Sequence, residues 1–198
     1  MVQNEIEKLE NEMCEINKKL TKLRRENPPV EVKNYRFKTF EGELSLLDLF
    51  ADNDTLFLIH NMGQGCRYCT LWADGINPFI PHLENLYSVV LVSKDAPHEQ
   101  RELANSRGWR FRMASHGGGE YIREQSVGSD TNSPGIVCYV RKNNKIYRKN
   151  KSVFGPGDEY CSFWNIISLA GEDDESVIPQ FFYWKRPVKM DDGGVGLN

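Results

Sequence analysis

Apolar residues near the N-terminus recur at alternating spacings of four and three. Side chains at these spacings share one narrow stripe of an α-helix, the pattern of a heptad seam. Asn27-Pro28-Pro29 ends the predicted helix, because proline cannot continue a helix and disfavours helical geometry in the residue before it. Two interpretations are open: a helix docked along its own domain, and a coiled-coil arm that forms a homodimer through residues 2–26. The seam consists of Val2, Ile6, Leu9, Met13, Ile16, Leu20 and Leu23.

Two apolar runs without clean alternation, at 55–60 and 89–93, are typical of strands covered on both faces of a sheet. A helix is predicted after each run. The first, 70–86, is interrupted where Pro78 and Pro81 each remove a backbone hydrogen bond, and the second, 98–107, ends at Gly108. A further extended segment follows. This strand-helix-strand-helix order predicts neighbouring strands in one sheet with helices on its faces.

The flanking regions predict smaller elements. Residues 35–40 alternate as a half-buried strand does, and Ser45 is placed to cap a short helix. The stretch from Gly117 to Ser133 predicts a long loop. A hairpin turning at 143–144 follows it.

A last helix is predicted from Asp158 or Glu159 to Ala170, with Gly171 placed to end it. Its apolar residues predict one buried side. That side consists of Phe163, Ile166, Ile167 and Leu169.

Composition places the chain among ordinary globular proteins. It has 198 residues, 39% of them hydrophobic and 27% charged, with a formal net charge of -3. One domain is expected at 30–171, preceded by the heptad helix and linker at 1–29 and followed by an extension at 172–198. The charge gives no field suited to nucleic acid. No apolar run approaches the roughly 18 residues of a membrane span and the N-terminus lacks a signal-peptide layout, so we expect a cytoplasmic protein without membrane partners.

The strongest chemical signal is Cys66-Arg67-Tyr68-Cys69, between a predicted strand and a predicted helix. Backbone N–H groups and the helix dipole at such a position favour a thiolate on Cys66, and Arg67 adds positive charge. Cys69 lies one turn further on, where it can close or resolve a disulfide. This redox chemistry needs no cofactor. The other cysteines, Cys14, Cys138 and Cys161, are interpreted as packing residues.

These residues also carry a family resemblance. The strand, the Cys-x-x-Cys motif, Leu71-Trp72-Ala73-Asp74-Gly75, Gly108-Trp109-Arg110-Phe111 and a later proline-led strand resemble the thioredoxin-like family catalogued as DUF899, over roughly Tyr35 to Gly171. The resemblance implies a thioredoxin-like three-layer α/β/α sandwich with a mixed central sheet, here with an N-terminal helical extension. The heptad helix and the triple glycine do not resemble ordinary family features. The family's layout is similar to that of peroxiredoxins and thiol-disulfide oxidoreductases, and the resemblance assigns no activity.

The thioredoxin arrangement implies two further expectations. A proline, usually in the cis form, precedes the strand that faces the motif, and Pro134 occupies that place. A peroxiredoxin carries threonine three residues before its reactive cysteine, whereas this chain has Gly63. Disulfide exchange is therefore favoured over peroxide reduction.

Several neighbours of the motif have open roles. Tyr68 lies between the cysteines, and Trp72 is interpreted as core packing or as a substrate platform. Asp74 is either a proton relay or a structural carboxylate. His60, at the end of the preceding strand, and His116 are more often structural than catalytic.

The sequence thus predicts a thiol-disulfide oxidoreductase acting on a protein or small-molecule disulfide or thiol. A non-enzymatic thioredoxin-fold binding protein and a thiol peroxidase are the alternatives. A zinc half-site and an inert motif remain open for the cysteine pair itself.

Overall fold

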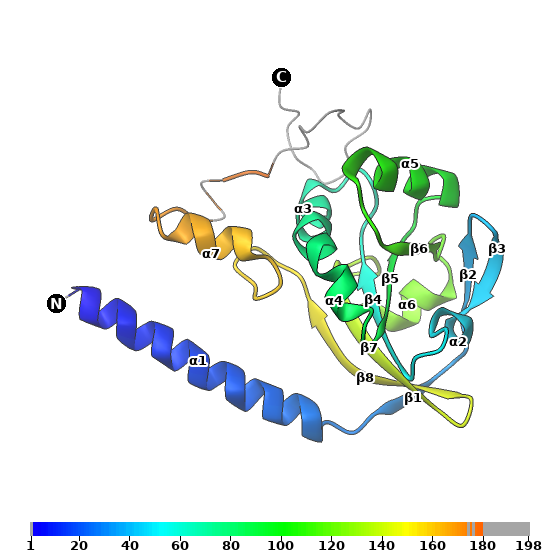
Figure 1. Ribbon diagram of the computed structural model, residues 1–198, viewed down its shortest axis with the longest axis horizontal. Helices are drawn as coiled ribbons and strands as arrows, with labels where there is room; N and C mark the ends of the chain where they lie inside the picture. Colours follow the sequence, from blue (N-terminus) through cyan, green and yellow to red (C-terminus); the bar gives the residue numbers. More distant parts are fainter. Residues whose placement is uncertain (1, 174, 176, 180–198) are drawn as a thin grey trace.

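The computed structural model describes residues 2–173, 175 and 177–179. Its centre is an eight-stranded sheet in the order β1-β8-β7-β4-β5-β6-β2-β3 (Figure 1). The strands are β1 (Val30–Val32), β2 (Arg36–Thr39), β3 (Gly42–Ser45), β4 (Thr55–His60), β5 (Ser88–Ser93), β6 (Arg112–Ser115), β7 (Gly135–Lys142) and β8 (Lys145–Val153).

The strand directions make this a mixed sheet. β4 runs parallel to β5, and β5 runs parallel to β6. β7 joins the other side of β4 in the antiparallel direction, and the remaining pairs are also antiparallel. All six residues of β5 are buried, as expected for a strand covered on both faces. The predicted central strands are confirmed.

Helices cover both faces of the sheet. One apolar core joins Ile59 and Leu91 to side chains of α3 (Arg67–Ile76), α4 (Ile80–Leu83), α5 (Pro97–Arg107) and α7 (Ser162–Ser168). A second core on the opposite face joins Leu58 and Val90 to α2 (Leu46–Leu49) and α6 (Glu120–Gln125). The three-layer α/β/α sandwich predicted from the sequence is therefore confirmed.

Local signals set several element ends. The helix after the cysteines breaks at the prolines into α3, the short 3₁₀ helix η1 (Asn77–Phe79) and α4. Gly108 ends α5 with a φ of 67°, in the left-handed region that favours glycine. The side chain of Ser45 accepts a hydrogen bond from the backbone of Asp48, which caps α2.

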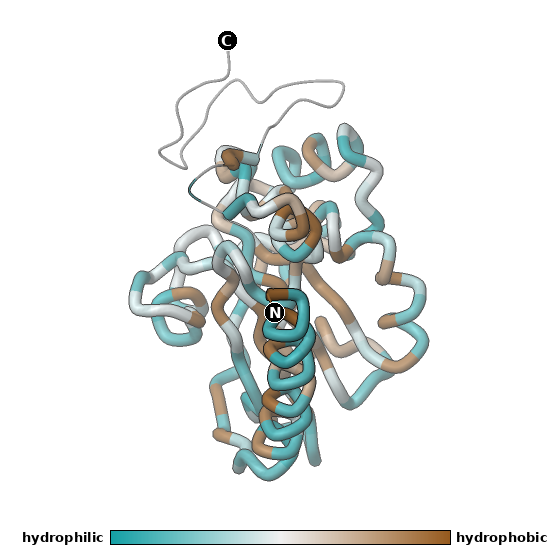
Figure 2. The backbone as a smooth tube through the Cα atoms, turned by 90° about the vertical axis from the view of Figure 1, so that its left-hand side faces the viewer, coloured by the Kyte–Doolittle hydropathy of each residue, from teal (hydrophilic) through white to brown (hydrophobic). Residues whose placement is uncertain are grey.

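Helix α1 (Val2–Glu26) does not dock on its own domain. None of its residues is buried, and it extends away from the sheet (Figure 1). Apolar positions recur among hydrophilic ones along its length (Figure 2). The interpretation of α1 as a helix docked along its domain is wrong for the part of the chain that the structure describes, because no residue of α1 is buried there.

Other sequence-based expectations also need correction. The predicted loop at 117–133 contains α6, whose Tyr121 and Ile122 are buried. On the predicted side of the last helix, Phe163 and Ile167 pack partly buried against the core, whereas Ile166 and Leu169 are 63% and 84% exposed. The buried residue of α7 is Trp164. Cys14 is exposed on α1 and is not a packing residue.

Most of the extension predicted at 172–198 lies outside the described residues. No helix in the described part of the chain is both long and apolar enough to cross a membrane.

Candidate dithiol site

The Cys-x-x-Cys motif lies at the end of the sheet where the parallel strands finish. The loop 61–65 leads from β4 to Cys66, which is the N-cap residue of α3. The neighbouring strand β5 ends at Ser93, and the antiparallel strand β7 begins opposite His60 at Gly135. Three separate parts of the sequence therefore meet at this end of the sheet.

The two cysteines are held as an adjacent, reduced pair. The Cys66 sulfur accepts a hydrogen bond from the backbone N–H of Cys69, with an N···Sγ distance of 3.1 Å. The Cys69 sulfur accepts one from the backbone N–H of Met62, at 3.3 Å. The helix start thus gives Cys66 an N–H donor and the preceding loop gives Cys69 one, and each donor stabilises negative charge on its sulfur.

Both sulfurs lie in a closed environment. Cys66 is 2% exposed and Cys69 is 3% exposed. Burial, followed by the hydrogen bond with Cys66, raises the pKa of Cys69 well above its ordinary value. The Met62 thioether sulfur lies 4.0 Å from the Cys66 sulfur. Cys69 is therefore a protonated thiol at neutral pH.

The loop before Cys66 depends on a glycine and on an acid that the sequence analysis missed. Gly63 has a φ of +122°, and a Cβ atom there would lie 2.8 Å from Oδ1 of Asp95. Oδ2 of Asp95 accepts a hydrogen bond from the backbone of Gln64 at 2.7 Å. Asp95 could have been found from its position, because it follows β5, whose carboxyl end lies beside that of β4. A threonine at position 63 would require a different loop.

Pro134 lies at the end of the sheet where the cysteine motif lies. Its peptide bond is trans, and no cis peptide bond occurs among the described residues. The Pro134 carbonyl accepts a hydrogen bond from Phe154 at 2.9 Å, next to the pairing of Gly135 with His60. The isomer of this peptide bond, which the sequence left open, is therefore trans, and Pro134 lies directly before β7.

Arg67 is a buried residue and not an exposed positive charge beside the motif. It is 1% exposed, and its guanidinium donates to the carbonyl of Pro179 at 3.4 Å. Residues 177–179 thus return to the first turn of α3.

Tyr68 and Trp72 belong to an aromatic cluster beneath α7. Tyr68 stacks on Trp164 with ring centroids 6.3 Å apart, and Trp72 stacks on Phe154 at 5.8 Å. The indole N–H of Trp72 donates to the Asp158 carboxylate at 2.9 Å. Trp72 is 2% exposed, which agrees with its interpretation as core packing.

The Asp74 carboxylate serves a structural contact away from the sulfurs. Arg107 donates to both of its oxygens, at 2.9 and 2.5 Å, and the indole N–H of Trp109 donates at 2.8 Å. Asp74 follows Cys66 by eight residues, which corresponds to about 12 Å along a helix. This geometry assigns Asp74 to the attachment of α5 to α3 and not to a proton relay at the dithiol.

His60 and His116 lie together on the other face of the sheet. Both contact Tyr121, whose hydroxyl is 2.6 Å from Nε2 of His60. Burial, then the nearby His116 and Lys151, lowers the pKa of His60 to about 3. Burial, then Lys94, lowers the pKa of His116 to about 4. Both imidazoles are therefore neutral at pH 7.

Metal ligation by Cys66 and Cys69 would need further ligands close to the two sulfurs. Within the described ranges, no group of three or more His, Cys, Asp and Glu side chains is arranged to hold a metal ion. The zinc alternative for Cys66 and Cys69 thus lacks further ligands in this part of the chain.

The sheet order, the helices on both faces and the position of the cysteine pair define a thioredoxin-like protein. The chain belongs to the family described as "Bacterial protein of unknown function (DUF899)", whose model matches residues 3–186. The match includes the heptad helix, so the expectation that this helix lies outside the family pattern is wrong. No curated protein matches the chain.

Solved structures with the same fold are distant in sequence. A protein from Chlorobium tepidum described as a candidate thiol:disulfide interchange protein DsbE is 14% identical, with a TM-score of 0.52, and the alignment covers 72% of this chain and 96% of that one. Reduced Prx3 from Vibrio vulnificus, in complex with hydrogen peroxide, is 13% identical with a TM-score of 0.52, covering 70% and 96%. AhpC from Enterococcus faecalis is 11% identical with a TM-score of 0.51, covering 71% and 89%. These similarities establish the fold alone.

Proposed function

We propose that this protein is a thiol-disulfide oxidoreductase in which Cys66 is the attacking thiolate and Cys69 is the resolving thiol. The observation that carries the proposal is the N–H donated by Cys69 to the Cys66 sulfur at the start of α3. Cys66 is the N-cap of α3, where this donor and the helix dipole favour a thiolate, whereas burial and the hydrogen bond with Cys66 raise the pKa of Cys69 and keep it protonated. The two thiols therefore have different roles.

The reaction takes place in two exchanges. The Cys66 thiolate attacks one sulfur of a substrate disulfide, forms a mixed disulfide and releases the other half as a thiolate. Cys69 passes its proton to that thiolate and attacks the Cys66 sulfur, which releases the second half. The substrate gains the two electrons that the dithiol loses. An external thiol reductant then restores the pair, which suits a cytoplasmic location.

The burial of both sulfurs limits the substrate. A disulfide reaches Cys66 only after the thioether of Met62, which lies against the sulfur, moves aside. A small disulfide needs a smaller opening than a disulfide in a folded protein does. We therefore favour a low-molecular-weight disulfide as substrate.

Peroxide reduction is the less favoured activity of this site. Gly63 occupies the place of the peroxiredoxin threonine, and its positive φ together with the nearby Asp95 carboxylate excludes a β-branched residue from this loop. Gly63 has no side chain and therefore offers no hydroxyl to a peroxide.

Trapping the mixed disulfide tests the proposed roles. In a Cys14→Ser background, which removes the exposed cysteine of α1, Cys69→Ser treated with oxidised glutathione should accumulate one glutathione adduct on Cys66, because the resolving thiol is missing. Cys66→Ser should form none. Cys161→Ser, at another buried cysteine, is the matched control and should behave like the unaltered protein. Equal adduct formation by Cys66→Ser and Cys69→Ser, measured by mass spectrometry, would contradict the assignment of roles.

A further inference from the structure

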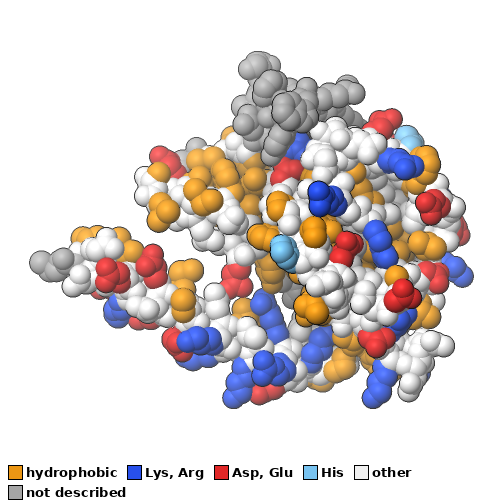
Figure 3. Space-filling view, viewed as in Figure 1, with side chains coloured by type: hydrophobic (Ala, Val, Ile, Leu, Met, Phe, Trp, Pro, Cys, Tyr) orange, Lys and Arg blue, Asp and Glu red, His pale blue; other side chains and the backbone are white. Residues whose placement is uncertain are grey.

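The N-terminal helix presents an apolar stripe that no other described residue of the chain buries. Among its seam residues, Leu9, Ile16 and Leu23 are 51%, 59% and 63% exposed. The space-filling view shows open space between α1 and α7 (Figure 3). A 25-residue helix spans about 37 Å, and such a helix gains most of its stability in proteins from packing of its apolar face. The exposed stripe therefore needs a partner.

The base of α1 is fixed to the sheet, so the helix is presented at a defined position. The Lys149 ammonium donates a hydrogen bond to the backbone carbonyl of Arg25 at 2.8 Å, and the Asn150 side-chain amide donates one to the backbone carbonyl of Arg24 at 3.0 Å. The Arg24 guanidinium donates to the hydroxyl of Tyr160 at 3.0 Å. Among the described residues, these hydrogen bonds hold the C-terminal turn of α1 and leave its earlier turns available for docking.

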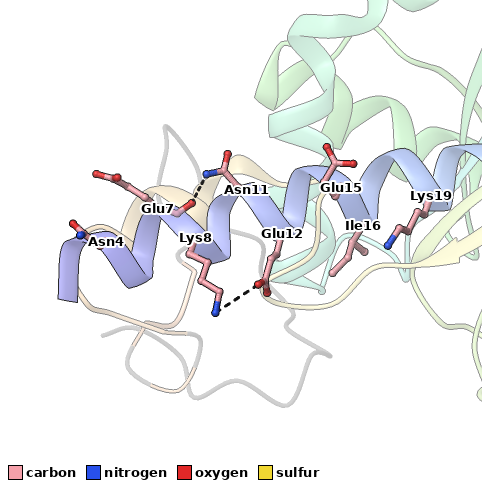
Figure 4. Close-up of a pocket in the computed structure, with 8 residues that line it drawn as sticks. All are labelled: Asn4, Glu7, Lys8, Asn11, Glu12, Glu15, Ile16 and Lys19. Atoms are coloured by element: carbon pink, nitrogen blue, oxygen red, sulfur yellow. Dashed lines mark hydrogen bonds and ion pairs between the residues drawn. The ribbon is translucent and has the colours of Figure 1, made fainter. Parts of the chain in front are cut away.

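Polar side chains of α1 form hydrogen bonds and ion pairs with one another and with the backbone of the same helix. Asn11 donates to the backbone of Glu7, and Lys8 forms an ion pair with Glu12 (Figure 4). Lys18 pairs with Glu15 in the same way. The unsatisfied part of the surface is the apolar stripe.

The charges of α1 are segregated along its length. Residues 2–13 carry four glutamates and one lysine, a net charge of -3, whereas residues 14–26 carry five lysines and arginines and two glutamates, a net charge of +3. A second α1 running in the opposite direction places each acidic half against a basic half. A parallel partner would instead place like charges together.

We propose that α1 pairs with α1 of a second copy of this chain as an antiparallel coiled coil. The heptad spacing supports this pairing, because one alignment brings every inner seam residue against an apolar residue. In that alignment Ile6 packs on Leu23 of the partner subunit, Leu9 on Leu20 of the partner subunit, and Met13 on Ile16 of the partner subunit.

Residues beside the seam discriminate between the two directions. Glu12 and Lys19 each directly precede a seam residue. In the antiparallel pair, Glu12 faces Lys19 of the partner subunit, and the contact occurs twice by symmetry. In a parallel pair, Lys19 would face Arg24 of the partner subunit and Glu5 would face Glu10 of the partner subunit, both like-charge contacts. The antiparallel direction is therefore favoured.

Sedimentation equilibrium of the full chain, between about 1 and 200 µM, tests the proposal. We expect a concentration-dependent dimer. Lys19→Glu should weaken it about tenfold, since two attractive contacts become repulsive. Lys18→Glu, which makes the same charge change away from the seam, should leave the dimer unchanged. Glu12→Lys combined with Lys19→Glu should restore it.

Two outcomes of that experiment overturn the proposal. A monomer throughout the concentration range would show that no second copy covers the stripe. A dimer strengthened by Lys19→Glu would show a parallel pair, because the new glutamate would then face Arg24 of the partner subunit.

Cross-linking tests the direction independently. In a background with Cys14, Cys66 and Cys69 changed to serine, Leu9→Cys and Leu20→Cys are prepared as separate proteins. An antiparallel pair predicts an oxidised dimer only when the two are mixed. Dimers formed by Leu9→Cys alone would contradict the antiparallel direction.

Discussion

The buried histidine pair predicts a specific loss of stability in mild acid. Both imidazoles are neutral in the folded protein, with pKa values of about 3 for His60 and about 4 for His116, against a usual value of 6.5. Between these values the unfolded chain binds protons that the folded protein does not. Stability from this source is therefore fully present above pH 6.5 and is lost as the pH falls below it.

The expected magnitude follows from the distance between the working pH and 6.5. At pH 5 each histidine lies about 1.5 pH units below its unfolded pKa, and each unit corresponds to about 1.36 kcal/mol. At pH 5 each histidine therefore lowers the free energy of unfolding by about 2 kcal/mol relative to neutral pH, and the pair lowers it by about 4 kcal/mol. The pKa of Asp48 is lowered from its usual 3.8, so its contribution to stability changes only below about pH 3.8 and does not affect a comparison at pH 5.

Urea unfolding at pH 7.5 and pH 5 measures this difference as a shift in midpoint. A variant with His60→Gln and His116→Gln should lose most of the pH dependence, although it starts from a lower stability. The exposed His82 and His98, changed to glutamine together, provide the matched control and should retain the full dependence. Equal stability of the unaltered protein at the two pH values would show that the folded protein does not hold these two histidines neutral.

Three further substitutions test the structural roles assigned around the site. Asp74→Asn should cost about 3 kcal/mol in urea unfolding, because it breaks a largely buried ion pair, whereas Asp54→Asn, in an exposed pair, should cost less than about 1 kcal/mol. Gly63→Ala should destabilise the protein more than Gly42→Ala does; both sites have positive φ, but only at Gly63 would the new Cβ meet a neighbouring carboxylate. Met62→Ala should speed alkylation of the nucleophilic cysteine by iodoacetamide, and an unchanged rate would show that this side chain does not limit access.

Much of the fold could be predicted because its signals are local. The apolar run at 55–60 had to form a strand buried on both faces, and the prolines at 78 and 81 had to interrupt the following helix. Helix α6 was missed because Gly117-Gly118-Gly119 signals a loop, whereas burial of Tyr121 against the sheet stabilises a short helix directly after it. That contact joins residues far apart in sequence.

The position of the two cysteines in the candidate site could be predicted from the sequence, but most of the contacts around them could not. The position of Cys66 and Cys69 at a helix start follows from the chain order. The contact of Asp95 with the loop before Cys66, and the ion pair that occupies Asp74, depend on how separate segments pack. The apolar stripe of α1 indicated a partner, but periodicity alone cannot distinguish a docked helix from a free one.

The most direct test of the proposed activity is a redox titration of the unaltered protein in glutathione buffers, read by mass spectrometry after alkylation. We expect one two-electron transition in which Cys66 and Cys69 form a disulfide reversibly, while Cys138 and Cys161 stay alkylatable after unfolding and the exposed Cys14 takes up at most one glutathione. If Cys66 and Cys69 remain reduced under all glutathione ratios, or oxidise irreversibly, the proposed function is wrong.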